Sequence, residues 1–125
     1  MWVYANPNPE GLSVPDCVIR AMCIALNKPW EEVSDELYSI ARSSHTVTCD
    51  DHAWGKYLYM HGARPFTLPE ACPTCISVKA FSTIFNTGIY IIGTGHHAVC
   101  VIDGNYYDTW DSGNEIPTFF WWIAE

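Results

Sequence analysis

The spacing of apolar residues changes from a helical period in the first half of the chain to a strand period in the second. Between Cys17 and Leu26, apolar residues stand at positions 18, 19, 22, 23 and 26, as on one face of a helix. Asp16 or Ser13 can cap the start of this segment. The pattern therefore predicts a helix that begins near Cys17.

Three more helices are expected before the period changes. The break at Lys28-Pro29 precedes a helix from Trp30 to about Arg42, which buries one apolar stripe. A short helix near 53–61 should end at Gly62, because glycine is a usual C-terminal cap. Ser77 can cap a fourth helix.

From Ile89 onward the apolar period is two, which is typical of strands. We expect strands near 89–93, 97–102, 105–110 and 117–123, with Asp103-Gly104 as the turn of the middle hairpin. The opening segment to Pro15 is expected to be an extended arm. Helices followed by an antiparallel sheet predict an α+β fold.

A length of 125 residues predicts one domain that spans residues 1–125, and the 49% of hydrophobic residues is typical of a folded chain. The apolar runs are strand-sized, so no membrane-spanning helix is expected. The first residues lack a signal-peptide pattern, which favours a cytoplasmic location in which the six cysteines are free thiols. A net charge of −8 disfavours nucleic acid and favours a cationic partner or substrate.

The candidate chemistry combines Cys17 with the hairpin "HHAVCVIDGNYYDTW". A thiol in the first turn of a helix is more easily ionised, because the unpaired N–H groups favour an anion. If Asp103-Gly104 is a two-residue loop, His97 and Asp108 lie on the same face as diagonal neighbours. The alternative interpretation is a buried cysteine and a hydrogen-bonded core histidine.

Two neighbouring residues compete for these roles. His96 would point to the opposite face of a strand from His97, so only one of them can address Cys17. A three-residue loop would exchange Asp108 for Asp111. We choose His97 and Asp108, and expect Asp111 to cap a turn.

The hairpin resembles that of papain-like cysteine peptidases, in which a His-Ala-Val strand start is followed by a strand that ends in Asn-Ser-Trp; here Asp108-Thr109-Trp110 stands at the second motif. The resemblance implies a papain-like fold with Cys17 as nucleophile, His97 as general base and acid, Asp108 as orienting group and Trp110 as a shield. Shorter stretches, "DCVIRAMCIAL", "CPTC" and "YYDTWDSGNEIP", resemble small papain-like proteins of bacterial viruses and prophages.

The expected activity is that of a cysteine hydrolase that cleaves a peptide, amide or related acyl bond and needs no cofactor for catalysis. In papain a Gln completes the oxyanion hole; here Asn6 or Asn8 is the candidate donor, beside the backbone N–H of Cys17. Ordinary turn roles are the alternative for both asparagines. The rival function is an inactive papain-like module that binds a host factor.

A second constellation could hold a structural zinc ion. A Cys-x-x-His and a Cys-x-x-Cys supply four ligand types that suit tetrahedral zinc: Cys49, His52, Cys72 and Cys75. The alternative is that Cys49 and His52 are incidental.

Overall fold

The computed structural model describes residues 1–69, 71 and 73–123. In chain order the elements are β1 (Trp2–Tyr4), α1 (Cys17–Leu26), α2 (Trp30–Ser43), α3 (Asp51–Met60), β2 (Arg64–Thr67), α4 (Val78–Ile84), β3 (Ile89–Gly93), β4 (Ala98–Ile102), β5 (Asn105–Asp108) and β6 (Phe119–Ile123).

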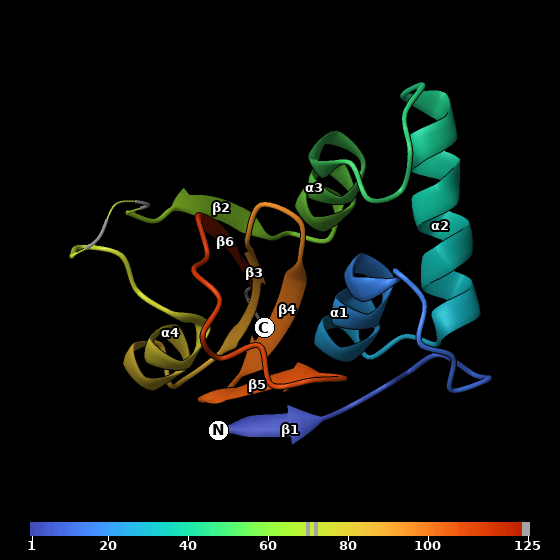
Figure 1. Cartoon of the computed structure of the whole chain (residues 1–125). Helices are drawn as coiled ribbons and strands as arrows, with labels where there is room; N and C mark the ends of the chain where they lie inside the picture. Colours follow the sequence, from blue (N-terminus) through green and yellow to red (C-terminus); the bar gives the residue numbers. More distant parts are fainter. Residues whose placement is uncertain (70, 72, 124–125) are drawn as a thin grey trace.

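The strands form a sheet in the order β1-β5-β4-β3-β6-β2 (Figure 1). Among the described residues every strand pairing is antiparallel except that of β1 with β5, which is parallel. Helices precede most of the strands and pack on this mainly antiparallel sheet, so the α+β fold class predicted from the sequence is confirmed.

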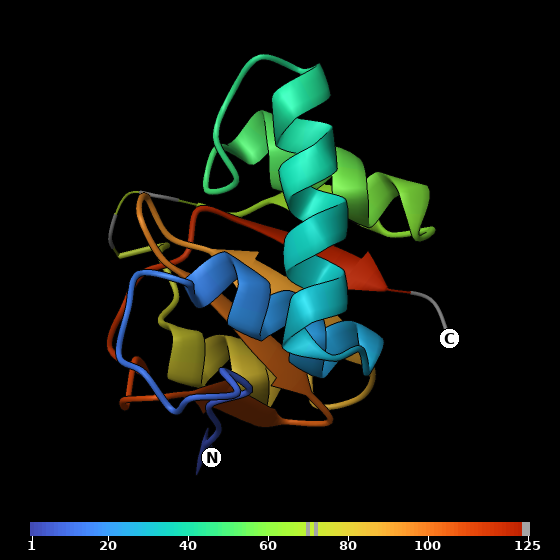
Figure 2. The same ribbon diagram turned by 90° about the vertical axis from the view of Figure 1, so that its right-hand side faces the viewer.

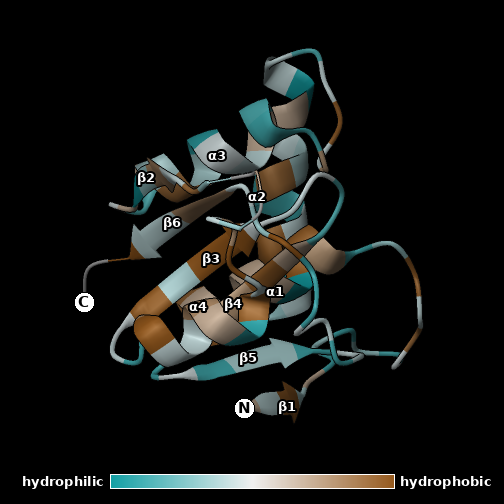
Figure 3. Cartoon of the chain, turned by 60° about the vertical axis from the view of Figure 1, so that its left-hand side comes forward, coloured by the Kyte–Doolittle hydropathy of each residue, from teal (hydrophilic) through white to brown (hydrophobic). Residues whose placement is uncertain are grey.

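The two faces of the sheet are covered by different helices. Helices α1, α2 and α3 lie on one face and α4 on the other (Figures 1 and 2). Along β4, Ala98 and Cys100 face α1 while Val99 and Val101 face α4, because successive side chains of a strand alternate. Burial on both faces explains why β3 and β4 are mainly hydrophobic and β5, nearer an edge, is not (Figure 3).

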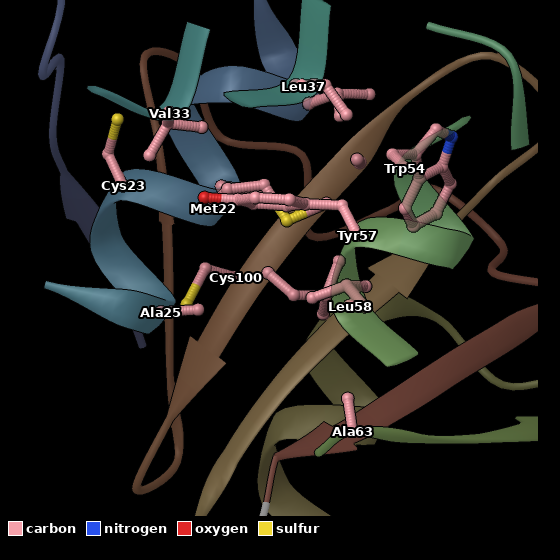
Figure 4. Close-up of a cluster of buried hydrophobic side chains, with 14 of the residues drawn as sticks. Met22, Cys23, Ala25, Val33, Leu37, Trp54, Tyr57, Leu58, Ala63 and Cys100 are labelled. Carbon is pink, nitrogen blue, oxygen red and sulfur yellow. The ribbon is translucent and has the colours of Figure 1, made fainter. Parts of the chain in front are cut away.

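The larger core lies between the three helices and the sheet. Met22 of α1, Leu37 of α2 and Tyr57 and Leu58 of α3 are fully buried there and meet the Cys100 side of β4 (Figure 4). Burial of each such side chain contributes roughly 1.5–3 kcal/mol to stability. This packing fixes where α1 starts relative to β4.

Three local predictions need correction. The arm contains a strand, β1, whose residues pair with β5; a three-residue segment is too short to show a period. The solvent-exposed edge strand β2 was missed because all its residues are exposed and show no alternation. Asp16 stands at the N-cap of α1 without a side-chain capping bond, whereas Ser77 caps α4 as predicted.

No helix in the described residues is long and apolar enough to cross a membrane.

Candidate active site

Cys17 is the first residue of α1 and is half-buried at the wall of a cavity of about 280 Å³. Burial raises the pKa of this thiol. Hydrogen bonds from the His97 ring and the Ala98 backbone, with the charges of His97 and Arg20, more than offset that effect and hold the pKa below its ordinary value. The structure therefore places an easily ionised sulfur at the cavity wall.

His97 directly precedes β4, and its ring lies between Cys17 and Asp108. Its Nε2 is 2.6 Å from Asp108 Oδ2, which leaves Nδ1 as the ring nitrogen that faces the Cys17 sulfur. Burial opposes a charge on the ring, but the hydrogen bonds and charges of Asp108 and Cys17 raise the pKa of His97 to about 9. At neutral pH this arrangement favours a thiolate beside an imidazolium.

The hairpin has the register that brings His97 and Asp108 together. Asp103 and Gly104 have φ values of 48° and 86°, and Ile102 pairs with Asn105 as a two-residue loop requires. A turn with positive φ at both central positions matches the twist of the strands. The geometric part of the prediction, that His97 and Asp108 meet on one face, is confirmed.

Asp108 ends β5 and is 3% exposed. Burial opposes its charge, but the His97 ring, the Ser112 hydroxyl and the Thr109 N–H all donate hydrogen bonds to its carboxylate and hold the pKa of Asp108 below its ordinary value. The carboxylate is therefore ionised and fixed in orientation.

Sequence reasoning missed two residues that support Asp108. Arg20, on the buried side of α1, has its guanidinium 3.6 Å from Asp108 Oδ1 and also forms an ion pair with Asp16. Ser112 is fully buried and donates to Asp108 Oδ2 at 2.8 Å. No local signal marks either residue, because Arg20 stands outside the apolar positions 18, 19, 22, 23 and 26 of the predicted first helix and Ser112 follows the last residue of β5 in a loop.

The neighbouring candidates lie outside the hydrogen-bonded chain. The Trp110 ring centroid is 5.1 Å from that of His97, so the indole covers the imidazole. His96 is exposed at the cavity rim. Asp111 accepts hydrogen bonds from the Tyr106 hydroxyl and the Gly113 N–H, which is the turn role expected of it.

The side-chain amides of the two asparagines of the arm are both bonded to nearby residues. The Asn6 amide donates to the Leu12 carbonyl and the Asn8 amide donates to Asp16. Neither is among the residues that line the cavity of Cys17. Cys17 and Val18 do line the cavity, and the N–H groups in the first turn of a helix such as α1 have no partner within the helix.

The cavity is lined by residues of the start of α1, the loop between β3 and β4 and the start of α3, and Figure 1 shows where these elements lie. Its lining is Cys17, Val18, Cys49, Asp51, Trp54, Thr94, Gly95, His96, His97 and Ala98. The Cys17 sulfur and the His97 imidazole thus lie at the wall of one cavity of about 280 Å³.

The four predicted zinc ligands are not a cluster in the described residues. Cys49 is an exposed free thiol, and His52 Nδ1 lies 3.5 Å from Asp50 Oδ2. Cys72 lies outside the described residues. Cys75 is disulfide-bonded, which corrects the expectation of free thiols at that position and means that zinc binding there would require reduction. In the described part of the chain no group of three or more potential ligands could hold a metal ion; the zinc site stays a prediction.

No protein-family model matches this chain, and the comparisons with curated proteins and with solved structures gave no significant match.

Proposed function

We propose that the protein is a papain-like cysteine hydrolase that cleaves an amide, peptide or related acyl bond through an acyl-Cys17 intermediate. The observation that carries the proposal is the hydrogen-bonded chain from Cys17 through His97 to Asp108, with the sulfur at the start of a helix and at the wall of a cavity. The likeness of the hairpin motif to papain-like peptidases supports the same assignment.

In the acylation step the Cys17 thiolate attacks the carbonyl carbon of the substrate. The carbonyl oxygen becomes an oxyanion that the N–H groups in the first turn of α1 stabilise. The His97 imidazolium donates its proton to the leaving group, the bond between the acyl carbon and the leaving group breaks, and a thioester remains on Cys17. Asp108 stabilises the imidazolium and fixes the ring so that Nδ1 faces the sulfur.

In the deacylation step the neutral His97 ring takes a proton from water, and the hydroxide attacks the thioester carbon. The bond between the acyl carbon and sulfur breaks, the acyl group leaves as a carboxylic acid, and the thiolate of Cys17 and the imidazolium of His97 are restored. The indole of Trp110, 45% exposed, shields the contact between His97 and Asp108 from water. This chemistry uses residues of the chain alone, and a cytoplasmic location would keep Cys17 reduced.

Selective alkylation tests the proposed nucleophile. At pH 6.0 an ordinary thiol is only about 0.3% ionised, so iodoacetamide should label Cys17 at least tenfold faster than Cys49, which is exposed and free. Cys23 and Cys100 serve as slow internal references because burial raises their pKa values. Rates at each cysteine are measured by peptide mass spectrometry.

The two adjacent histidines supply a matched control. His97→Ala should abolish the fast labelling at pH 6.0, since the thiolate loses its imidazolium, whereas His96→Ala should preserve it. Equal labelling of Cys17 and Cys49, or a His97→Ala variant that still reacts rapidly, would contradict the proposal.

The alternative is a non-enzymatic module that binds a host factor. The observation in its favour is that the Asn6 and Asn8 amides are bonded to Leu12 and Asp16 and do not line the cavity of Cys17. A reactive Cys17 without turnover of any acyl substrate would favour this alternative.

A further inference from the structure

A larger groove adjoins the cavity of Cys17. It has a volume of about 560 Å³ and lies between α3, β2 and β6. Its lining is Asp51, Trp54, Pro65, Phe66, Thr67, Phe119 and Trp121. The groove is therefore mainly apolar and aromatic, in a chain whose net charge is −8.

Two glycines allow the aromatic walls to form. A Cβ atom at Gly93 would lie 2.3 Å from the Phe119 ring, so only glycine lets this ring lie across β3. A Cβ atom at Gly55 would lie 3.2 Å from the Trp121 ring, which approaches α3 closely for the same reason. Phe119 also packs on Trp54, with ring centroids 5.4 Å apart. The walls are held by packing against the core.

The groove adjoins the cavity of Cys17, because Asp51 and Trp54 line both spaces. Trp54 is 3% exposed and its indole N–H donates to Asp51 Oδ1 at 3.0 Å. A carboxylate is thus fixed where the two spaces meet. An uncharged or cationic group can pass this point, whereas an anionic group would be repelled.

We propose that this groove is the specificity site of the enzyme and that it receives a bulky apolar, preferably aromatic, group attached near the scissile acyl bond. The inference rests on the proposed function and adds the substrate class. The volumes of the two spaces suit a small ligand or a short peptide segment, in which apolar walls contribute affinity and few polar groups set orientation. The shared walls favour a substrate group over a separate partner protein as the occupant.

Chloroacetamides that share one reactive group and differ only in the substituent on the amide nitrogen test the proposed substrate class at Cys17. N-phenethyl chloroacetamide should alkylate Cys17 about tenfold faster than N-(2-hydroxyethyl) chloroacetamide, because its ring enters the groove. A 4-carboxyphenethyl arm should lose most of that advantage near Asp51. Iodoacetamide, which has no arm, reports the reactivity of the sulfur itself.

Adjacent tryptophans on β6 provide a matched pair of variants. Trp121→Leu should bring the ratio of phenethyl to hydroxyethyl rates close to one, whereas Trp122→Leu should leave it unchanged, because Trp122 is not part of the groove. Thr67→Arg, at an exposed position of the edge strand, should block the groove without loss of core packing. The rate at which iodoacetamide labels Cys17 is measured in each variant as the reference for the reactivity of the sulfur itself.

The outcomes separate the two proposals. A wild-type ratio near one, with selective iodoacetamide labelling of Cys17, overturns the groove assignment and leaves the hydrolase proposal standing. Unselective iodoacetamide labelling overturns both. Self-association of the wild type that Trp121→Leu abolishes, with no advantage for the phenethyl arm, would instead assign the groove to contact between copies of this chain.

Discussion

Asp108 and Asp111 stand three positions apart, yet their carboxylates have different partners. Asp108 is buried and binds the imidazole of His97, whereas Asp111 is exposed and holds a turn through Tyr106 and Gly113. Asp108 also forms an ion pair with Arg20 and accepts a hydrogen bond from Ser112. Its replacement by alanine would leave these buried polar groups without their partner and destabilise the protein. Asparagine keeps the shape, removes the charge and exchanges one acceptor oxygen for an NH2 group, a smaller disturbance than alanine.

Asp108→Asn should lower the pKa of His97 from about 9 toward the ordinary histidine value. The sign follows from the charge: the carboxylate stabilises the protonated ring, so its loss makes deprotonation easier. The histidine ring protons followed by NMR against pH measure this shift. Asp111→Asn is the control and should leave the His97 titration unchanged; an unchanged His97 pKa in Asp108→Asn would show that the carboxylate does not act on the imidazole.

The contact between His97 and Asp108 could be predicted from the sequence because it follows from strand alternation and a recognisable turn. The dipeptide Asp103-Gly104 fixed the loop length, and loop length fixes which side chains share a face. Arg20 and Ser112 could not be placed in the same way. Their partners lie on other elements, and no sequence period relates a helix residue to a strand end.

At the scale of elements, each part of the site is held by a helix or strand whose position the core determines. Cys17 opens α1, His97 precedes β4 and Asp108 ends β5. The start of α1 could be predicted from apolar spacing, whereas β1 and β2 could not. These two strands lie at the sheet edges, where short length and exposure remove the alternation that identifies a strand.

The close contact between Gly93 of β3 and the Phe119 ring of β6 leads to a prediction about stability. Gly93→Ala should lower the free energy of unfolding by about 1–3 kcal/mol, because the new methyl group overlaps the Phe119 ring. Urea denaturation of the variant measures the loss. In a Phe119→Leu background the same substitution should cost clearly less; equal losses in both backgrounds would show that the ring does not make the critical contact.

At the scale of the whole molecule, the sheet separates two packed faces, and the candidate site lies on the face covered by α1, α2 and α3. The cavity of Cys17 and the aromatic groove lie next to each other on that face and share Asp51 and Trp54 as lining residues. The α+β class could be predicted because the period changes once along the chain. The groove could not, since it needs α3, β2 and β6 to meet, and the sequence shows no long-range pairing.

The most direct test of the central claim is whether Cys17 forms an acyl intermediate that water then releases. With p-nitrophenyl acetate at neutral pH, we expect a burst of about one p-nitrophenolate per chain, slower steady turnover, and an acetyl group on the Cys17 peptide by mass spectrometry. Cys17→Ala should show neither burst nor acetylated peptide. A wild-type protein whose Cys17 reacts with iodoacetamide but accepts no acetyl group would contradict the assignment as a hydrolase.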